Sequence, residues 1–269
     1  MEKGWQLPIL PTTNVNPAFA YRSLLGILLW IARTTRPDIY FAVVLLCSCA
    51  ANFNTECVTA AKRVLRYLKG TRSHGLTFSA NYTTAAMNLP LKLEIELWVD
   101  ADWGGDLSTR RSHSGSILAL FGNFIICTCR KQDSVALSTF HAELVSLTEG
   151  CKDYKCFKNI LIEAAARFPD FLTFPESVPI NCDNISAVFS SQNREHNKRT
   201  RHIDIRYFYI RDMIEQKEVV TQHIPSEENI ADIFTKALAA PLYRTFVERL
   251  HVLPEPAVPD PTNEEQSDP

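Results

Sequence analysis

One stretch of the sequence, "LKLEIELWVDADWGGD", constrains the fold more than any other. Apolar residues alternate with polar ones from Leu91 to Val99, which is the period-two pattern of a β-strand with one buried face. Three carboxylates then follow, Asp100, Asp102 and Asp106, with no basic residue between them. Like charges this close repel one another unless a cation neutralises them. The stretch therefore predicts a strand that delivers acids to a functional edge of a sheet.

The chain around this strand divides into regions of different character. Before the strand, apolar residues recur at helical spacing, which predicts a small helical subdomain. After it, strand and helix patterns alternate, which predicts a mixed α/β domain. The expected boundaries are 1–16 for a loose lead-in, 17–78 for the helical subdomain, 79–92 for a connector, 93–240 for the α/β domain and 241–269 for a C-terminal extension. The extension is rich in proline and acids, and we expect it to be disordered from about residue 254.

Several elements of the α/β domain can be placed on the sequence. "GSILALFGNFIICTC" predicts a hairpin with Gly122-Asn123 as its two-residue turn. A long helix is expected from about Thr139 to Phe168. "INCD" and "VVTQHIP" predict strands, and "ISAVFSSQ" and "TRHIDIRYFYIRDMIEQ" predict helices. Ser226 is expected to cap a closing helix, "EENIADIFTKAL".

Composition excludes some classes and favours an intracellular protein. The net charge of -2 gives no sign of a uniformly basic or acidic partner. The eight cysteines show no C-x-x-C pair and no zinc spacing, so we expect reduced thiols in the cytoplasm or nucleus. The N-terminus lacks the pattern of a secretory signal, and no apolar run is long enough to span a bilayer. We therefore expect no membrane partner.

Four carboxylates stand out by position: Asp100, Glu143, Asp183 and Asp232. They fall at strand ends and in helices of the expected domain, so they can converge on one edge of its sheet. Taken singly, each suits an ordinary turn, cap or solvated helix position, and only the set of four argues for a site. All-oxygen ligands suit Mg²⁺, with Mn²⁺ as a substitute, and two such ions can catalyse phosphodiester hydrolysis.

Most of the chain, from Tyr21 to Leu238, resembles the C-terminal part of copia-type LTR-retrotransposon Pol polyproteins. Seven collinear stretches carry the resemblance: "YRSLLGILLWIARTTRPDI", "AAKRVLRYLKGT", "DADWGGDLSTRRSHSGS", "AELVSLTEGCKD", "CDNISAV", "RTRHIDIRYFYIRD" and "IPSEENIADIFTKAL". The resemblance implies a ribonuclease H-like α/β fold, with a mixed five-stranded sheet flanked by helices. It also implies that the helical subdomain corresponds to the thumb-like helices that follow a reverse-transcriptase palm.

The family's activity is metal-dependent hydrolysis of the RNA strand of an RNA–DNA hybrid. Its metal ligands, Asp, Glu, Asp and Asp, match Asp100, Glu143, Asp183 and Asp232 of this sequence. The paired-aspartate motif of a polymerase palm is absent, so we expect no DNA synthesis, and a palm-containing chain becomes a candidate partner. The histidine that related enzymes carry on a loop before the last acid is also missing here.

A basic segment and several polar residues are candidates for holding the nucleic acid. Clustered arginines and lysines suit phosphate contact, and hydroxyl and amide groups can bond to sugar hydroxyls. The candidates are Arg110, Arg111, Ser114, Asn184, Lys198, Arg199, Arg201 and His202. A solvated helix face is the alternative interpretation of the basic segment, and a structural role is the alternative for the histidine.

Two other functions are compatible with the sequence. The first is a catalytically silent retrotransposon-derived remnant that binds nucleic acid or protein, which the missing palm favours. The second is a DNA-joining transposase of the same broad fold. The second requires an end-recognition domain, and none is visible in the sequence.

Overall fold

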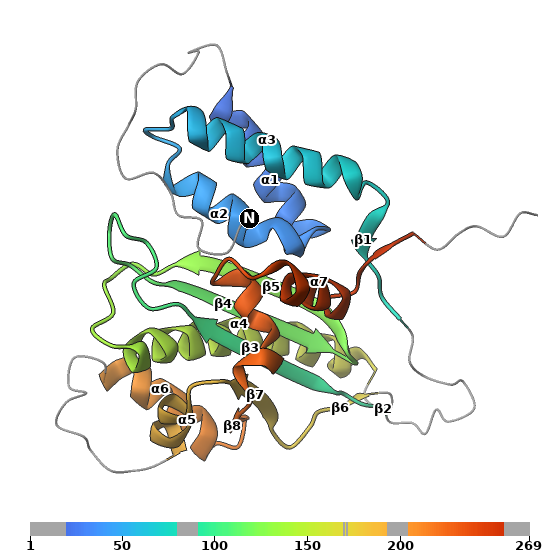
Figure 1. Ribbon diagram of the computed structural model, residues 1–269. Helices are drawn as coiled ribbons and strands as arrows, with labels where there is room; N and C mark the ends of the chain where they lie inside the picture. Colours follow the sequence, from blue (N-terminus) through green and yellow to red (C-terminus); the bar gives the residue numbers. More distant parts are fainter. Residues whose placement is uncertain (1–19, 80–90, 169, 171, 193–203, 256–269) are drawn as a thin grey trace, which may run out of the picture.

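Five strands form the central sheet of the computed structural model, in the order β5-β4-β3-β7-β8 (Figure 1). The structure describes residues 20–79, 91–168, 170, 172–192 and 204–255. The strands are β3 (Ile95–Ala101), β4 (His113–Leu120), β5 (Asn123–Lys131), β7 (Val178–Cys182) and β8 (Val219–His223). β4 pairs antiparallel with both β3 and β5, whereas β7 lies parallel to both β3 and β8. This confirms the expected mixed five-stranded sheet.

The hairpin of β4 and β5 is confirmed, but its turn lies one residue earlier than expected. Phe121 and Gly122 occupy the turn, both with positive φ (51° and 71°), whereas the sequence favoured Gly122-Asn123. Two positive φ values in succession are typical of the type I′ turn, which matches the twist of the flanking strands. Asn123 instead begins β5, where its side-chain amide donates to the Phe121 carbonyl (3.1 Å) and bonds to the Ser79 backbone.

One face of the sheet is covered by helices from the same half of the chain. They are α4 (Thr139–Arg167), α5 (Ile185–Gln192) and α6 (Asp204–Glu215). α4 matches the expected helix to within one residue, and the Ser138 side chain accepts a hydrogen bond from the His141 N–H at its start. Leu97 and Val99 of β3 face this layer, within a cluster that also contains Leu144 and Ile210.

The other face of the sheet is covered by the helical subdomain, as Figure 1 shows above the strands. This layer consists of α1 (Tyr21–Thr34), the short 3-10 helix η1 (Pro37–Ile39), α2 (Tyr40–Ser48) and α3 (Thr55–Gly70). Its core is continuous with Ile117 and Cys129 of the sheet. The prediction of one buried face for β3 is therefore wrong, because Trp98 and Asp100, which alternate with the apolar residues, also lie under a covering layer.

A buried ion pair fastens the helical layer to the C-terminal part of the fold. Arg36 makes two hydrogen bonds to the Asp38 carboxylate, at 3.0 and 2.7 Å, and both side chains are almost fully buried. The hydroxyl of Tyr67 on α3 donates to the same carboxylate (2.7 Å). Tyr243 donates to the Asp38 carbonyl (3.1 Å). Separating the partners of such a pair would leave a buried charge without its counter-charge, which is strongly destabilising. The network therefore holds the helical layer in a fixed position.

The closing helix expected after Ser226 is wrong. Two 3-10 turns take its place, followed by a helix and a short strand: η4 (Ser226–Glu228), η5 (Ile230–Phe234), α7 (Ala240–Arg249) and β9 (Val252–Pro254). Asn229 separates the two turns with an extended backbone. Its side chain donates to the Val99 carbonyl (2.9 Å) and accepts from the Ala231 N–H, so the chain turns where a helix would continue.

Short strands connect distant parts of the chain. β1 (His74–Leu76) pairs antiparallel with β9, and β2 (Leu91–Lys92) pairs parallel with β6 (Leu172–Thr173). The first pair ties the end of the helical layer to the segment after α7. The expected disorder from about residue 254 falls mostly outside the described residues, which end at 255.

Gly115 allows the sheet and η5 to approach closely, which gives a testable prediction. A Cβ atom at Gly115 would lie 2.9 Å from the Ala231 carbonyl oxygen and 2.9 Å from Phe234 Cβ. We expect Gly115→Ala to lower the free energy of unfolding by about 1–3 kcal/mol, because backbone atoms cannot yield easily.

Gly26→Ala is the matched control. A Cβ at Gly26 meets nothing within 4 Å, and the residue lies exposed inside α1. Alanine there should stabilise the protein by up to about 1 kcal/mol through helix propensity. Urea denaturation of both variants measures the difference, and equal stability of the two would contradict the close approach.

Candidate metal centre

Asp100 lies one residue before the end of β3 and is 2% exposed. The Thr235 hydroxyl donates to its carboxylate oxygen Oδ2, across 135 residues of sequence. The backbone at this point is fixed as well, because the Ser146 hydroxyl on α4 donates to the Asp100 carbonyl (2.6 Å). The strand end is therefore held by α4 through its backbone and by the residue after η5 through its side chain.

Two further aspartates reach the same point from different elements. Asp183 directly follows β7, and Asp232 lies in η5. Carboxylate oxygens of Asp100, Asp183 and Asp232 all lie within 4.8 Å of one another. The Ser226 hydroxyl donates to Asp183 Oδ2 (2.6 Å), so the residue expected to cap a helix instead orients one of the acids.

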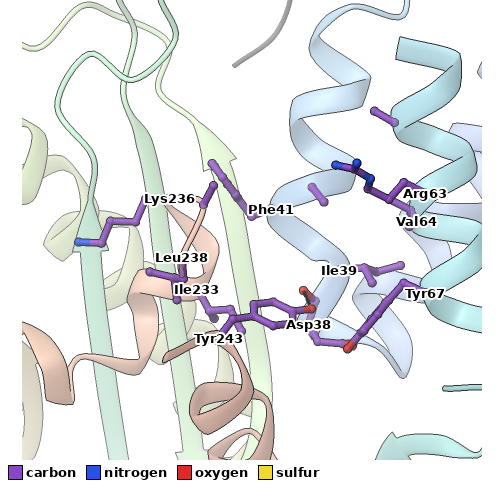
Figure 2. Close-up of a pocket in the computed structure, with 13 residues that line it drawn as sticks. Asp38, Ile39, Phe41, Arg63, Val64, Tyr67, Ile233, Lys236, Leu238 and Tyr243 are labelled. Atoms are coloured by element: carbon purple, nitrogen blue, oxygen red, sulfur yellow. Dashed lines mark hydrogen bonds between the residues drawn. The ribbon is translucent and has the colours of Figure 1, made fainter. Parts of the chain in front are cut away.

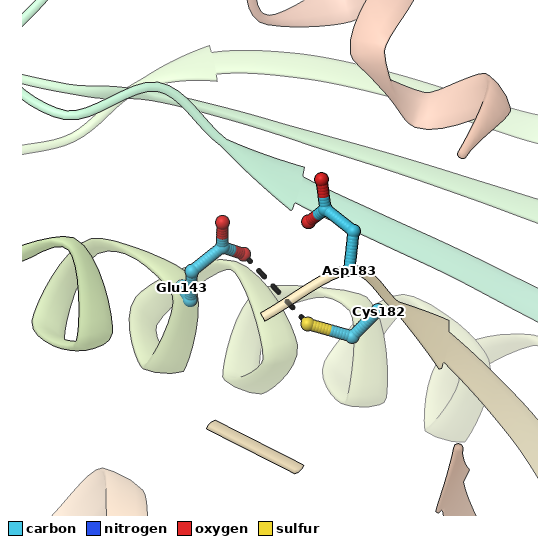
Figure 3. Close-up of side chains that lie close together, drawn as sticks. All are labelled: Glu143, Cys182 and Asp183. Atoms are coloured by element: carbon cyan, nitrogen blue, oxygen red, sulfur yellow. Dashed lines mark hydrogen bonds between the residues drawn. The ribbon is translucent and has the colours of Figure 1, made fainter. Parts of the chain in front are cut away.

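Glu143 completes the group from the first turns of α4 (Figure 3). It is 5% exposed, and a carboxylate oxygen lies within 4.8 Å of ligand atoms of Cys182 and Asp183. The Cys182 thiol donates weakly to Glu143 Oε2 (3.9 Å). Asp183 therefore lies between the group with Asp100 and Asp232 and the group with Glu143. The structure brings all four sequence-predicted acids together at one edge of the sheet.

Burial and mutual repulsion shift the ionisation of these acids. Burial, helped by the nearby Asp100, raises the pKa of Asp232 to about 8. Burial also raises the pKa of Asp100, and the charge of Asp183 adds to the shift. The pKa of Glu143 is raised well above its usual range by burial and then by Asp100 and Asp183. Neutral carboxyl groups are thus favoured as long as no cation balances their charge.

Lys236 supplies a positive charge that the sequence analysis missed. Its ammonium lies 2.8 Å from Asp232 Oδ1. Although partial burial acts to lower it, the charges of Asp100 and Asp232 raise the pKa of Lys236. The side chain borders a cavity of about 210 Å³ between the helical layer and η5. In Figure 2 its ammonium points away from the helices of that layer. Lys236 therefore offsets part of the repulsion among the acids.

The chemistry of the donors fits a hard divalent cation. The four acids offer carboxylate oxygens, which suit Mg²⁺ or Mn²⁺ better than zinc. Cys182 is the one soft donor in the group, and burial followed by the charge of Glu143 raises its thiol pKa well above the usual range. The thiol therefore stays protonated near neutral pH and is a poor ligand. Asp100, Glu143, Asp183 and Asp232 are the residues that would hold the metal.

The other two acids of the opening stretch have partners inside the fold. Asp102 accepts hydrogen bonds from the His113 backbone N–H and lies 3.3 Å from its ring nitrogen. Asp106 pairs with Lys131 and accepts from the Ser108 N–H, which forms a turn. Asp106 thus belongs to the turn, and Asp102 orients the start of β4. Neither joins the four-acid group.

The predicted nucleic-acid contacts fall in different environments. Arg110 and Arg111 are exposed in the loop between β3 and β4. Ser114 is 5% exposed, and its hydroxyl accepts a hydrogen bond from the Gln132 amide (2.9 Å). We therefore remove Ser114 from the proposed contacts.

Asn184 and the basic segment complete the predicted set. Asn184 is half-buried and caps α5, with its side-chain oxygen accepting from the Ala187 N–H (3.0 Å). Four of the predicted contacts lie outside the described residues: Lys198, Arg199, Arg201 and His202. These four stay predictions from the sequence alone.

Sequence reasoning missed residues that act on the acids from the segment after β8. Thr235, Ser226 and Lys236 all bond to them, and the His223 ring nitrogen lies 3.1 Å from the Asp183 carbonyl. Lys236 follows Asp232 by four residues, and this spacing was the available signal that the two side chains interact. The same spacing is equally typical of an ordinary surface ion pair on a helix. The two hydroxyls carried no signal.

The mixed five-stranded sheet, with helices on both faces and acids from β3, α4, the end of β7 and η5 at one edge, is that of a ribonuclease H-like domain. No protein-family model matches the chain. The retrovirus-related Pol polyprotein from transposon TNT 1-94 of Nicotiana tabacum is 33% identical over 218 residues, which cover 81% of this chain and 15% of that protein. The corresponding polyprotein from transposon RE1 of Arabidopsis thaliana is 30% identical over 247 residues, covering 92% and 16%.

The chain is thus homologous to the retrovirus-related Pol polyproteins of copia-type transposons, and it spans about one sixth of their length. Among solved structures, the crystal structure of LC11-RNase H1 in complex with RNA/DNA hybrid is 16% identical with a TM-score of 0.40. That match covers 53% of this chain and 94% of the other.

Within the described residues, no helix combines the length and the apolar character needed to cross a bilayer.

The ionisation of Asp232 predicts how stability depends on pH without added metal. A carboxyl group with a higher pKa in the folded than in the unfolded state contributes stability near pH 4 that is lost as the pH rises through about 8. We expect the free energy of unfolding in EDTA to fall across this range by several kcal/mol. Asp232→Asn should reduce this fall and raise stability at pH 8.

Lys236→Met should have the opposite effect in the same assay. Loss of the ammonium leaves the acids without their counter-charge, so stability in EDTA at pH 8 should decrease. Without the ammonium, the acids should bind Mg²⁺ more tightly. Added Mg²⁺ should then stabilise Lys236→Met more than the unsubstituted protein, because a cation that binds the folded state more tightly stabilises it more. Identical melting temperatures for both variants and the parent at pH 8 would show that these charges do not interact.

Proposed function

We propose that this chain is a metal-dependent endonuclease of the ribonuclease H type, which hydrolyses the RNA strand of RNA–DNA hybrids. One observation carries the proposal. Four carboxyl groups from β3, α4, the end of β7 and η5 meet at one sheet edge, and three of them lie within 4.8 Å of one another. Burying acids together destabilises a fold, so such a group calls for a functional explanation.

The proposed ligands are Asp100, Glu143, Asp183 and Asp232, with Mg²⁺ as the ion, Mn²⁺ as a substitute and two ions per site. When bound, such ions lower the pKa of water and stabilise the charge on the leaving oxygen of a phosphodiester. The chain supplies the arrangement. Thr235 orients Asp100 and Ser226 orients Asp183, so the acids are in place before substrate arrives.

A proton carrier near the site is His223, at the end of β8. Its ring lies 3.1 Å from the Asp183 carbonyl, and the residue is exposed. Its place on a strand differs from the loop position of the histidine that the resemblance implies. We propose that the exposed imidazole of His223 passes protons between the site and solvent.

Hybrid hydrolysis as the reaction, rather than another phosphodiester cleavage, rests on the homology to copia-type Pol polyproteins. The nucleic-acid contacts that we propose from the described residues are Arg110, Arg111 and Asn184. A palm-containing reverse-transcriptase chain stays a candidate partner.

Cleavage of labelled substrates tests the proposal. The purified chain with Mg²⁺ should cut the RNA strand of an RNA–DNA hybrid and leave DNA duplex and single-stranded RNA largely intact. Asp183→Asn should reduce the rate by about 100-fold or more, since it removes a ligand without changing side-chain shape. The rate is measured as the initial velocity of product formation on a denaturing gel.

Asp212→Asn is the matched control, because it removes an exposed carboxylate on α6 that accepts a hydrogen bond from Gln216, four residues further along the chain (2.8 Å). It should leave the rate unchanged. Cutting that persists in Asp183→Asn would reject the site. Binding of the hybrid without any cutting at saturating Mg²⁺ or Mn²⁺ would instead select the catalytically silent remnant.

A further inference from the structure

Two loops next to the carboxylates expose large apolar side chains. One loop, 102–112, follows β3 two residues after Asp100. The other, 132–138, ends five residues before Glu143. In Figure 1 both lie at the end of the sheet where β3 stops and α4 starts. The exposed apolar residues on them are Trp103 (55%), Leu107 (39%), Val135 (46%) and Leu137 (70%).

The indole of Trp103 is held in place although it is exposed. Its Nε1–H donates to the Ala136 carbonyl (3.0 Å), which joins the first loop to the second. The backbone N–H of Gln132 donates to the Ser112 carbonyl (2.8 Å), and this adds a second connection. A side chain fixed in this way loses little conformational entropy when it binds a flat ligand.

On the first loop, the exposed charged residues beside this indole are basic. The guanidinium of Arg110 lies 3.5 Å from the point where a Cβ on Gly104 would be, so it lies beside the residue that follows Trp103. Arg111 is exposed next to it. The two acids of the same loop are engaged, Asp102 with His113 and Asp106 with Lys131.

The second loop contributes one exposed acid, Asp133. Among the described residues of the two loops, the exposed charges are therefore two arginines and one aspartate. An apolar platform with a surplus of guanidinium groups complements a polyanion with flat bases. A protein partner would satisfy the apolar residues but leave the position of this platform, beside the carboxylates, without a reason.

We propose that Trp103, with Leu137 beside it and Arg110 next to it, is a stacking platform for a nucleotide adjacent to the scissile phosphate. The proposal rests on the proposed function, because it takes the carboxylates as the position of that phosphate. The indole stacks on a base or covers a sugar, and Arg110 and Arg111 contact neighbouring phosphates. Such stacking is independent of base sequence, since every base presents an aromatic face.

Intrinsic fluorescence tests the platform without any need for cleavage. The variants are made on an Asp183→Asn background and titrated with a non-fluorescent RNA–DNA hybrid. Stacking quenches indole emission, so the quench seen with Trp103 present should be lost in Trp103→Phe. It should persist in Trp30→Phe, which removes an indole that is 67% exposed on α1.

Affinity and its salt dependence supply the second measurement. Anisotropy of a labelled hybrid should show binding about 10-fold weaker for Trp103→Ala and near the parent value for Trp103→Phe. The slope of log affinity against log salt should stay unchanged in Trp103→Ala, whereas Arg111→Gln should reduce it by about one phosphate contact. Matching circular dichroism melts show that the variants are folded.

The outcomes separate this proposal from the proposed function. If the parent binds and cuts the hybrid while Trp103→Ala binds equally well, the platform is wrong and the function stands. If the parent binds with a Trp103-dependent quench but does not cut, the platform stands and the catalytic proposal fails. If the parent binds no RNA–DNA hybrid, no DNA duplex and no single strand, the platform is rejected as well. The exposed apolar residues of the two loops are then better explained by a protein partner.

Discussion

The sheet of this protein is apolar on both faces, and the rest of the structure depends on covering each of them. α4, α5 and α6 bury one face, and the helical layer buries the other. η5 is enclosed between that second layer and the strands, in a core that includes Phe234 and Phe246. Asp232, Thr235 and Lys236 are therefore positioned by packing that begins with helices about two hundred residues earlier in the chain. The helices α1, α2 and α3 thus take part in building the carboxylate group, although none of their residues joins it.

The carboxylate group works against the stability of the core that holds it. Burial raises the pKa of Asp100, Glu143 and Asp232, and each ionised acid raises the others further. The hydroxyl groups that orient the acids and the ammonium of Lys236 offset part of this repulsion, but they leave the group short of positive charge. This destabilising arrangement supports the cation binding that we propose for the group.

Much of the α/β fold could be predicted because its signals are local. Period-two alternation located β3, and helical spacing located α4 to within one residue. The four acids were found because strand ends and early helix turns meet at one edge. The break between η4 and η5 could not be found this way, since the Asn229 amide is bonded to the Val99 carbonyl, 130 residues away. The burial of Asp100 and the partial burial of Trp98 were missed for the same reason, because their cover comes from a distant segment.

The Arg36–Asp38 network has a consequence for how this protein can be divided. Tyr67 from α3 and Tyr243 from α7 both bond to Asp38, so the two ends of the described fold meet at one buried aspartate. β1 and β9 pair beside it. A cut in the connector before β2 would separate sequences that share a single core, and each piece would expose the surface it had buried. Because the helices and the five-stranded sheet share this core, recombination or protein engineering that preserves the carboxylate site has to transfer both together.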